Sequence, residues 1–356
     1  MERQAWIQIA YQTDGVFSVI LRLIIRIFVR YNSMSNIVFL DRSALSANIQ
    51  IPLVRGCSHW RNYLTTSPAK LVEHIGGAEV LVLSKVPISK ESLAACPRVK
   101  HIAVMATGYN IIDLDACKQY GVSVSNVPSY AATSVSEHVI SVALCLRREL
   151  IQYRAQVIDG AWQRSPAFCL FDKPVNDLAA STFGVIGFGE LGKATAKLAH
   201  GLGMNVVFCA RSPQTSEYAT QLSFNEVISN ADIISVHCSL NPSTENLINT
   251  TQFKRMKSSA ILINTARGGI VNEADLVDAI EANQIGGVGL DVLRHEPPGD
   301  NEPLLRLASR TNVIITPHSA WLSEQSMQSC AAILADNIEA YLSGNPINLV
   351  PLTTNT

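Results

Sequence analysis

The sequence predicts an α/β fold with two doubly wound parallel sheets, each in its own domain. From Met34 onward, short β-rich runs alternate with helical stretches, which is typical of parallel strands joined by helical crossovers. The chain has 356 residues, enough for two domains that each bury a hydrophobic core. With 47% hydrophobic and 16% charged residues, its composition is that of a soluble α/β protein.

The β-rich runs fall into two groups separated by a long helical stretch. The first group predicts strands at 36–40, 79–83, 100–105 and 121–127. A helix over 133–150 follows, and 160–180 has no clear periodicity, which indicates a surface segment. The second group predicts a six-stranded Rossmann-type sheet, with strands at 183–188, 205–210, 232–238, 260–265, 287–292 and 312–317. A closing helix over 323–344 ends at Gly344, with Pro346 beyond it.

The first 33 residues differ from the rest of the chain. In VFSVILRLIIRIFVR (16–30), Arg22, Arg26 and Arg30 recur at four-residue intervals, which places a basic stripe on one helical face. These arginines leave the run short of the roughly 18 uninterrupted apolar residues of a membrane-spanning helix. We expect translation to begin at Met34 and expect no membrane partner. A membrane-surface anchor and an organelle-targeting segment are the two alternatives.

Charge and cysteine content argue against several classes of partner. The 28 Lys and Arg residues nearly cancel the 29 Asp and Glu residues, so no global field favours nucleic acid. The eight cysteines are scattered without a C-x-x-C pair, and several lie inside apolar runs. We therefore expect buried thiols in a reducing cytoplasm and no metal site.

A glycine-rich loop, GFGELG (187–192), lies between the first strand and the first helix of the second group. Gly187 would permit a tight turn, Gly189 would let the backbone approach a pyrophosphate, and Gly192 would allow close packing of helix on strand. The helix N-terminus would add N–H donors and a positive dipole end. The motif in this context predicts a dinucleotide-binding site.

The residues after the next strand bear on the choice of dinucleotide. A strand at this position normally ends in an acid that binds the ribose hydroxyls, but here Ala210 takes its place and is followed by Arg211 and Ser212. A guanidinium binds a 2′-phosphate, which a carboxylate would repel. We therefore predict that NADP(H) is preferred. A surface role for Arg211, with a weak preference and NAD(H) also used, is the alternative.

Three polar side chains follow the last three predicted strands. Arg267, Glu296 and His318 would converge, because the carboxyl ends of parallel strands share one edge of the sheet. Histidine can donate a proton near neutral pH, a carboxylate can keep it charged, and an arginine can hold a substrate carboxylate. A nicotinamide-dependent ketone reductase is therefore the activity that the sequence predicts.

The chain resembles the D-isomer-specific 2-hydroxyacid dehydrogenase family over nearly all of 34–350. The motifs that carry the resemblance are GFGELG, NTARGG, GLDVLRHEPP, TPHSAW and the run 106–138. The resemblance implies that Arg267 orients the substrate, that Glu296 pairs with the histidine and that His318 is the acid/base. It also implies further contacts, which are Glu190 and Leu191 on the pyrophosphate, Thr265, Ala266 and Asp291 along the nicotinamide, and backbone near Ser84, Lys85 and Val86 on the substrate carboxylate.

The resemblance also implies an organisation. A flavodoxin-like substrate domain would comprise 34–137 plus 322–356, the dinucleotide domain would be 138–321, and the protein would be a homodimer. The motif TPHSAW ends in Trp321, and in this it resembles the glycerate dehydrogenase/hydroxypyruvate reductase branch of the family, whose substrates are small 2-keto acids. A dehydrogenase for a different 2-hydroxy acid and a dinucleotide-sensing, corepressor-like binding protein are the alternatives.

Overall fold

The computed structural model describes residues 35–172 and 174–352, which form two compact units. The prediction for residues 1–33 lies outside this part of the chain. The first unit runs up to Tyr130 and resumes at Glu324, and the second runs from Ala131 to Ser323. The division falls before the predicted residue 138, because the helix α6 (Ala132–Arg147) packs on α8, β10 and β11 of the second unit. No helix in the described residues is long and apolar enough to cross a membrane.

The first unit contains a five-stranded parallel sheet in the order β2-β1-β3-β4-β5. Four of its strands lie where the hydrophobic runs predict them. Its elements are β1 (Ser35–Phe39), β2 (Cys57–Asn62), β3 (Val80–Leu83), β4 (His101–Val104), β5 (Ser123–Ser125), the short helices η1 (Arg42–Ala44) and η2 (Pro68–Lys70), and the helices α3 (Leu71–Ile75), α4 (Lys90–Ala95), α5 (Leu114–Tyr120) and α13 (Glu324–Leu342). Strand β2 was not predicted.

The second unit contains a seven-stranded parallel sheet in the order β12-β11-β10-β9-β6-β7-β8. The order reverses at β6, so the crevice at its carboxyl end is the topological switch point. The strands are β6 (Thr182–Ile186), β7 (Asn205–Cys209), β8 (Thr220–Gln221), β9 (Ile233–Val236), β10 (Ile261–Asn264), β11 (Gly287–Leu290) and β12 (Val313–Ile315). The helices besides α6 are α7 (Leu150–Ile158), α8 (Glu190–Gly201), α9 (Phe224–Asn230), α10 (Thr250–Phe253), α11 (Glu273–Glu281) and α12 (Pro303–Leu307).

Two predictions for the secondary structure were wrong in detail. The second sheet has seven strands rather than six, because the two-residue edge strand β8 has no hydrophobic run of its own. The helix predicted over 133–150 is divided into α6 and α7 at Arg148 and Glu149. Glu149 has a left-handed backbone (φ 51°), which interrupts the helical hydrogen bonds although no glycine or proline marks the position.

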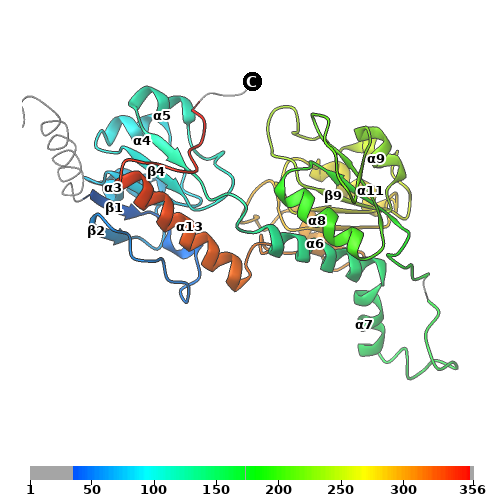
Figure 1. Ribbon diagram of the computed structural model, residues 1–356. Helices are drawn as coiled ribbons and strands as arrows, with labels where there is room; N and C mark the ends of the chain where they lie inside the picture. Colours follow the sequence, from blue (N-terminus) through cyan, green and yellow to red (C-terminus); the bar gives the residue numbers. More distant parts are fainter. Residues whose placement is uncertain (1–34, 173, 353–356) are drawn as a thin grey trace, which may run out of the picture. The chain divides into compact units, whose positions relative to one another are not determined.

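Helices cover both faces of the second sheet because its central strands are buried on both sides. A Cβ added at Gly184 would meet α9, whereas the next residue, Val185, lies against α8. On β11, a Cβ at Gly287 would meet Leu146 and one at Gly289 would collide with Val142. The glycines of the GVGL strand therefore let α6 lie close on the sheet, beside α8 (Figure 1).

Candidate active site

The loop after β6 has the geometry that its glycines predict. Gly187 has a positive φ of 94°, and a Cβ there would lie 2.7 Å from the backbone nitrogen of Cys238. A Cβ at Gly192 would collide with the carbonyl oxygen of Gly187, so only glycine lets α8 begin this close to the loop. Gly189 caps α8 without a side-chain hydrogen bond, and no atom lies within 4 Å of its would-be Cβ. The open space at the helix N-terminus is suited to an anion, with Glu190 and Leu191 in the first turn.

A cavity of about 550 Å³ extends from this loop to the end of β7. Its lining includes Gly187, Gly189, Ala210, Arg211, Ser212 and Asn241. Arg211 is the only arginine or lysine among the described residues that line it. The Gln221 side chain accepts from the backbone N–H of Gln214 at 2.8 Å and donates to the carbonyl oxygen of Ser212 at 3.1 Å. The edge strand β8 thus holds the segment that carries Arg211 and Ser212.

Arg267, Glu296 and His318 follow β10, β11 and β12, which are neighbours in the sheet. His318 Nδ1 lies 2.6 Å from Glu296 Oε2, and the two side chains are 25% and 30% exposed. A carboxylate only accepts, so the contact requires a proton on Nδ1 and directs Nε2 to other partners. The second oxygen, Glu296 Oε1, accepts from the backbone N–H of Leu293 at 2.9 Å, which fixes the carboxylate.

The turn that carries Arg267 is braced by Asn264 at the end of β10. The Asn264 side chain donates to the carbonyl oxygen of Arg267 at 2.9 Å and accepts from the backbone N–H of Ala266 at 3.0 Å. Between them, Thr265 has a buried hydroxyl oxygen without a hydrogen-bond partner in the described residues. A buried polar atom of this kind is costly unless a ligand satisfies it. Thr265 therefore fits a bound dinucleotide, which the resemblance also implies.

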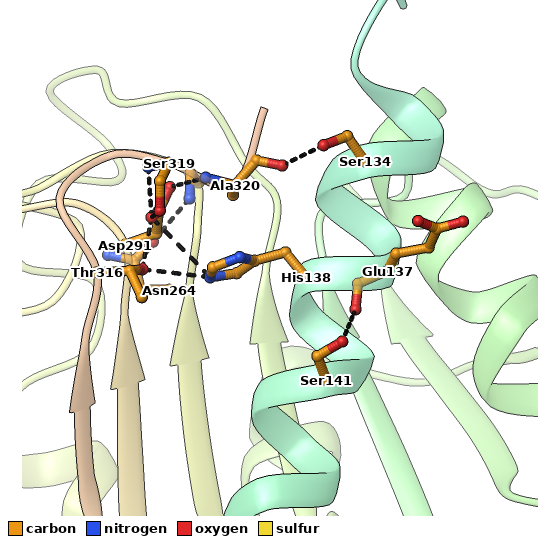
Figure 2. A network of polar contacts seen from close by, with 10 residues as sticks. Ser134, Glu137, His138, Ser141, Asn264, Asp291, Thr316, Ser319 and Ala320 are labelled. Carbon is orange, nitrogen blue, oxygen red and sulfur yellow. Dashed lines mark hydrogen bonds and ion pairs between the residues drawn. The ribbon is translucent and has the colours of Figure 1, made fainter. Parts of the chain in front are cut away.

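Asp291, which we expect along the nicotinamide, has several partners within the protein. It is 2% exposed, and its carboxylate accepts hydrogen bonds from Thr316, Ser319 and Ala320, on both sides of His318 (Figure 2). This internal role was not predicted from the sequence, nor were those of Thr316 and of His138 on α6. The only signal was the position of a threonine two residues before the histidine.

The predicted substrate contacts in the first unit have an unexpected partner. Asp41, just after β1, accepts from the backbone N–H of Ser84 at 2.9 and 3.0 Å and from that of Lys85 at 2.6 Å. Burial raises the pKa of Asp41, and these hydrogen bonds, with that of Val86, oppose the shift. An internal carboxylate thus uses backbone donors that were expected to hold a substrate carboxylate.

The switch-point loop, its cavity and the polar strand ends define a class of protein, the dinucleotide-dependent oxidoreductases. Residues 140–320 match the sequence profile of the D-isomer specific 2-hydroxyacid dehydrogenase, NAD binding domain. The chain belongs to this family and to its glycerate dehydrogenase-like branch, and it is a D-2-hydroxyacid dehydrogenase that binds a nicotinamide dinucleotide.

Relatives and solved structures agree with this assignment. The chain is 42% identical to a glycerate dehydrogenase of Methylorubrum extorquens over 318 residues, which cover 88% of this chain and 98% of the relative. It is 34% identical to a hydroxypyruvate reductase of Blautia hydrogenotrophica, over 80% of this chain and 88% of the relative. The crystal structure of the D-lactate dehydrogenase of Lactobacillus jensenii with NAD+ superposes with a TM-score of 0.73 at 28% identity, covering 89% of this chain and 99% of that one.

Proposed function

We propose that this protein reduces a small 2-keto acid, hydroxypyruvate or glyoxylate, to D-glycerate or glycolate with NADPH as the preferred hydride donor. The 2.6 Å contact between His318 and Glu296 carries the proposal. A histidine held by a carboxylate, with an arginine at the end of a neighbouring strand, suits the reduction of a carbonyl next to a carboxylate. The names of the two relatives, glycerate dehydrogenase and hydroxypyruvate reductase, favour these substrates.

In the proposed mechanism each of the three side chains has one task. The dinucleotide, when bound, supplies the hydride that reaches the keto carbon. His318 transfers the proton on Nε2 to the keto oxygen, and Glu296 stabilises the charged imidazole through Nδ1 before the transfer. Arg267 holds the substrate carboxylate and stabilises negative charge that develops on the keto oxygen. One hydride and one proton are consumed for each 2-hydroxy acid formed.

The preference for NADPH rests on the end of β7. Ala210 places no carboxylate in the cavity, and Arg211 is the guanidinium that a 2′-phosphate would bind. Ser212, in the segment held by Gln221, would donate a further hydrogen bond. NADH is the second candidate donor, because neither residue excludes a free ribose hydroxyl.

The substrate contacts proposed for the Ser84, Lys85 and Val86 backbone stay a prediction. Asp41 competes for the same donors, so a substrate carboxylate would have to share them or depend more strongly on Arg267. Activity in the cytoplasm is likewise a prediction from composition and cysteine content.

A homodimer is supported by an exposed apolar arm. Helix α7 and the loop after it extend away from the sheet of the second unit (Figure 1). Phe168 is 88% and Phe171 is 83% exposed, and Ile158 and Trp162 are also exposed. A cluster of exposed aromatic side chains indicates a protein interface, and we propose that a second copy of this chain covers it. Sedimentation of the purified chain, compared with a Phe168→Ser/Phe171→Ser variant, tests this assembly.

Steady-state rates with three keto acids and two dinucleotides test the proposed function. We expect rapid oxidation of NADPH with hydroxypyruvate and glyoxylate, slower oxidation with pyruvate, and D-glycerate as the product from hydroxypyruvate. A higher kcat/KM with NADH would refute the cofactor preference alone. A chain that binds the dinucleotide tightly but reduces none of the three acids would refute the proposed substrates.

A further inference from the structure

His318 has a backbone conformation that needs support. Its φ is 53°, in the left-handed region that side chains other than glycine rarely adopt. The backbone N–H of His318 donates to the carbonyl oxygens of Asp291 and of Thr316, both at 2.9 Å. A strained residue at a functional site persists only where its surroundings hold it in place.

The Asp291 carboxylate provides that support from both sides of His318. On one side, Oδ1 accepts from the Thr316 hydroxyl at 2.6 Å. On the other side, Oδ1 accepts from the backbone N–H of Ser319 at 2.8 Å, and Oδ2 accepts from that of Ala320 at 2.9 Å. The segment 316–320 is therefore held by one buried carboxylate. A rotation of the Thr316 hydroxyl would remove its hydrogen bond to Asp291 and thereby one of the three contacts that hold the segment.

Helix α6 adds an outer layer to this network. His138 Nε2 lies 3.2 Å from the Thr316 hydroxyl and 3.9 Å from Asp291 Oδ1, and the Ser134 hydroxyl donates to the carbonyl oxygen of Ala320 at 2.6 Å. Ser134 and His138 are four residues apart, so they share one helical face, and Figure 2 shows both directed at the segment. Ser141 lies further along α6 and instead binds the carbonyl oxygen of Glu137.

The proton count assigns a direction to these contacts. The Thr316 hydroxyl has one proton, which it donates to Asp291, so its lone pair must accept from His138. His138 therefore carries a proton on Nε2, and the chain of donors runs from His138 through Thr316 to Asp291. A side chain without an N–H at this position would leave the hydroxyl free to rotate.

We propose that His138 is a positioning residue for His318: its Nε2–H orients the Thr316 hydroxyl toward Asp291, and Asp291 holds the backbone of His318 in its strained conformation. Ser134 supports the same segment from the next turn of α6. The proposal rests on the proposed function, because it takes His318 as the proton donor. Small displacements of a catalytic group have large effects on rate, so the loss of His138 acts on kcat.

The test compares His138→Leu with His138→Gln. Glutamine can place an N–H near the position of Nε2, whereas leucine has a similar volume and no donor. We expect His138→Leu to lower kcat about tenfold, which corresponds to about 1.4 kcal/mol, and His138→Gln to retain at least about a third of the wild-type kcat. The KM for the dinucleotide and the melting temperature should stay close to wild type in both variants.

A serine pair on the same helix provides a matched control. Ser134→Ala removes a hydroxyl that binds the segment and should lower kcat about threefold, which corresponds to about 0.7 kcal/mol, whereas Ser141→Ala should leave it unchanged. A wild-type kcat in His138→Leu, or equal losses in the leucine and glutamine variants together with a lower melting temperature, would overturn the positioning role. A wild-type chain that reduces no keto acid would overturn the proposed function itself, and with it the role of His138.

Discussion

The contact between His318 and Glu296 gives the sharpest quantitative prediction. Glu296→Gln keeps an oxygen that can accept from Nδ1 but removes the negative charge 2.6 Å away. Hydrogen bonds to charged groups contribute about 1.5–3 kcal/mol, compared with about 1 kcal/mol for neutral ones. The difference is about 0.5–2 kcal/mol, so at about 1.4 kcal/mol per factor of ten the removal of the charge should lower kcat roughly 2- to 30-fold. Since both side chains are about a quarter exposed, solvent screening favours the lower end of this range.

The assay is the initial rate of hydroxypyruvate-dependent oxidation of NADPH at saturating concentrations of both substrates. Asp300→Asn is the matched control, because it removes an exposed carboxylate from the same loop. The loss in Glu296→Gln should fall on kcat, with the KM for the keto acid changed less than about threefold, because Arg267 still holds the substrate. Equal kcat values for Glu296→Gln and Asp300→Asn would refute the account of this pair.

Gly189→Ala should weaken NADPH binding at least about tenfold, measured by fluorescence titration, without a change in melting temperature, because the added Cβ projects into the open space where the backbone would meet a pyrophosphate. Gly201→Ala in the last turn of the same helix, where a Cβ also meets nothing, should leave NADPH binding unchanged although alanine favours the helix, and weaker binding in both variants would contradict the assignment of the loop. Arg211→Ala should raise the KM for NADPH at least about tenfold and leave that for NADH unchanged, since only NADPH carries the 2′-phosphate. A parallel rise in both KM values would indicate a general effect on the cavity instead. Burial lowers the pKa of His101 and of His237 from 6.5 to about 4, so the unfolded chain binds more protons between these values and stability falls as pH decreases from about 6.5 to 4. Over this range each histidine lowers the free energy of unfolding by up to about 3 kcal/mol, at about 1.4 kcal/mol per pKa unit. In urea denaturation at several pH values, the free energy of unfolding of His101→Gln should therefore fall less between pH 6.5 and 4 than that of wild type. Burial raises the pKa of Asp41, which contributes in the opposite direction, but this contribution is the same in both proteins and cancels in the comparison. An identical pH dependence in the two proteins would show that His101 is not held neutral.

Much of the second unit could be predicted because its strands are buried on both faces. Such strands appear as continuous runs of valine, isoleucine and leucine, and each predicted run of the second group corresponds to a strand from β6 to β12. The glycine positions were equally informative, because Gly187 and Gly192 stand where a Cβ would collide with backbone. Burial of a strand and the need for a glycine in a tight turn each involve only a few consecutive residues, so the sequence reveals them.

Features that depend on a single neighbour or on the tertiary structure could not be predicted. Strands β2 and β8 pair on one side only, so their sequences, CSHWRN and TQ, need no hydrophobic run. The break between α6 and α7 has no glycine or proline, only a left-handed glutamate.

The candidate site divides in the same way. The residues that follow the strand ends, Arg267, Glu296 and His318, were named from the sequence because sheet topology brings strand ends together. The contact of Asp41 with Ser84 and that of His138 with Thr316 were not predicted, because they join segments 43 and 178 residues apart. No local pattern specifies such pairs, and only the folded chain reveals them.

If His318 supplies the proton in the reduction of a 2-keto acid, its replacement by alanine must lower kcat strongly. With hydroxypyruvate and NADPH, we expect the His318→Ala variant to have a kcat at least about 100-fold below wild type, within the range for loss of general acid catalysis, and an unchanged Kd for NADPH. A His318→Ala variant that binds NADPH normally and keeps more than about a third of the wild-type kcat would show that His318 is not the proton donor. Removal of a general acid should lower the rate at least about 100-fold.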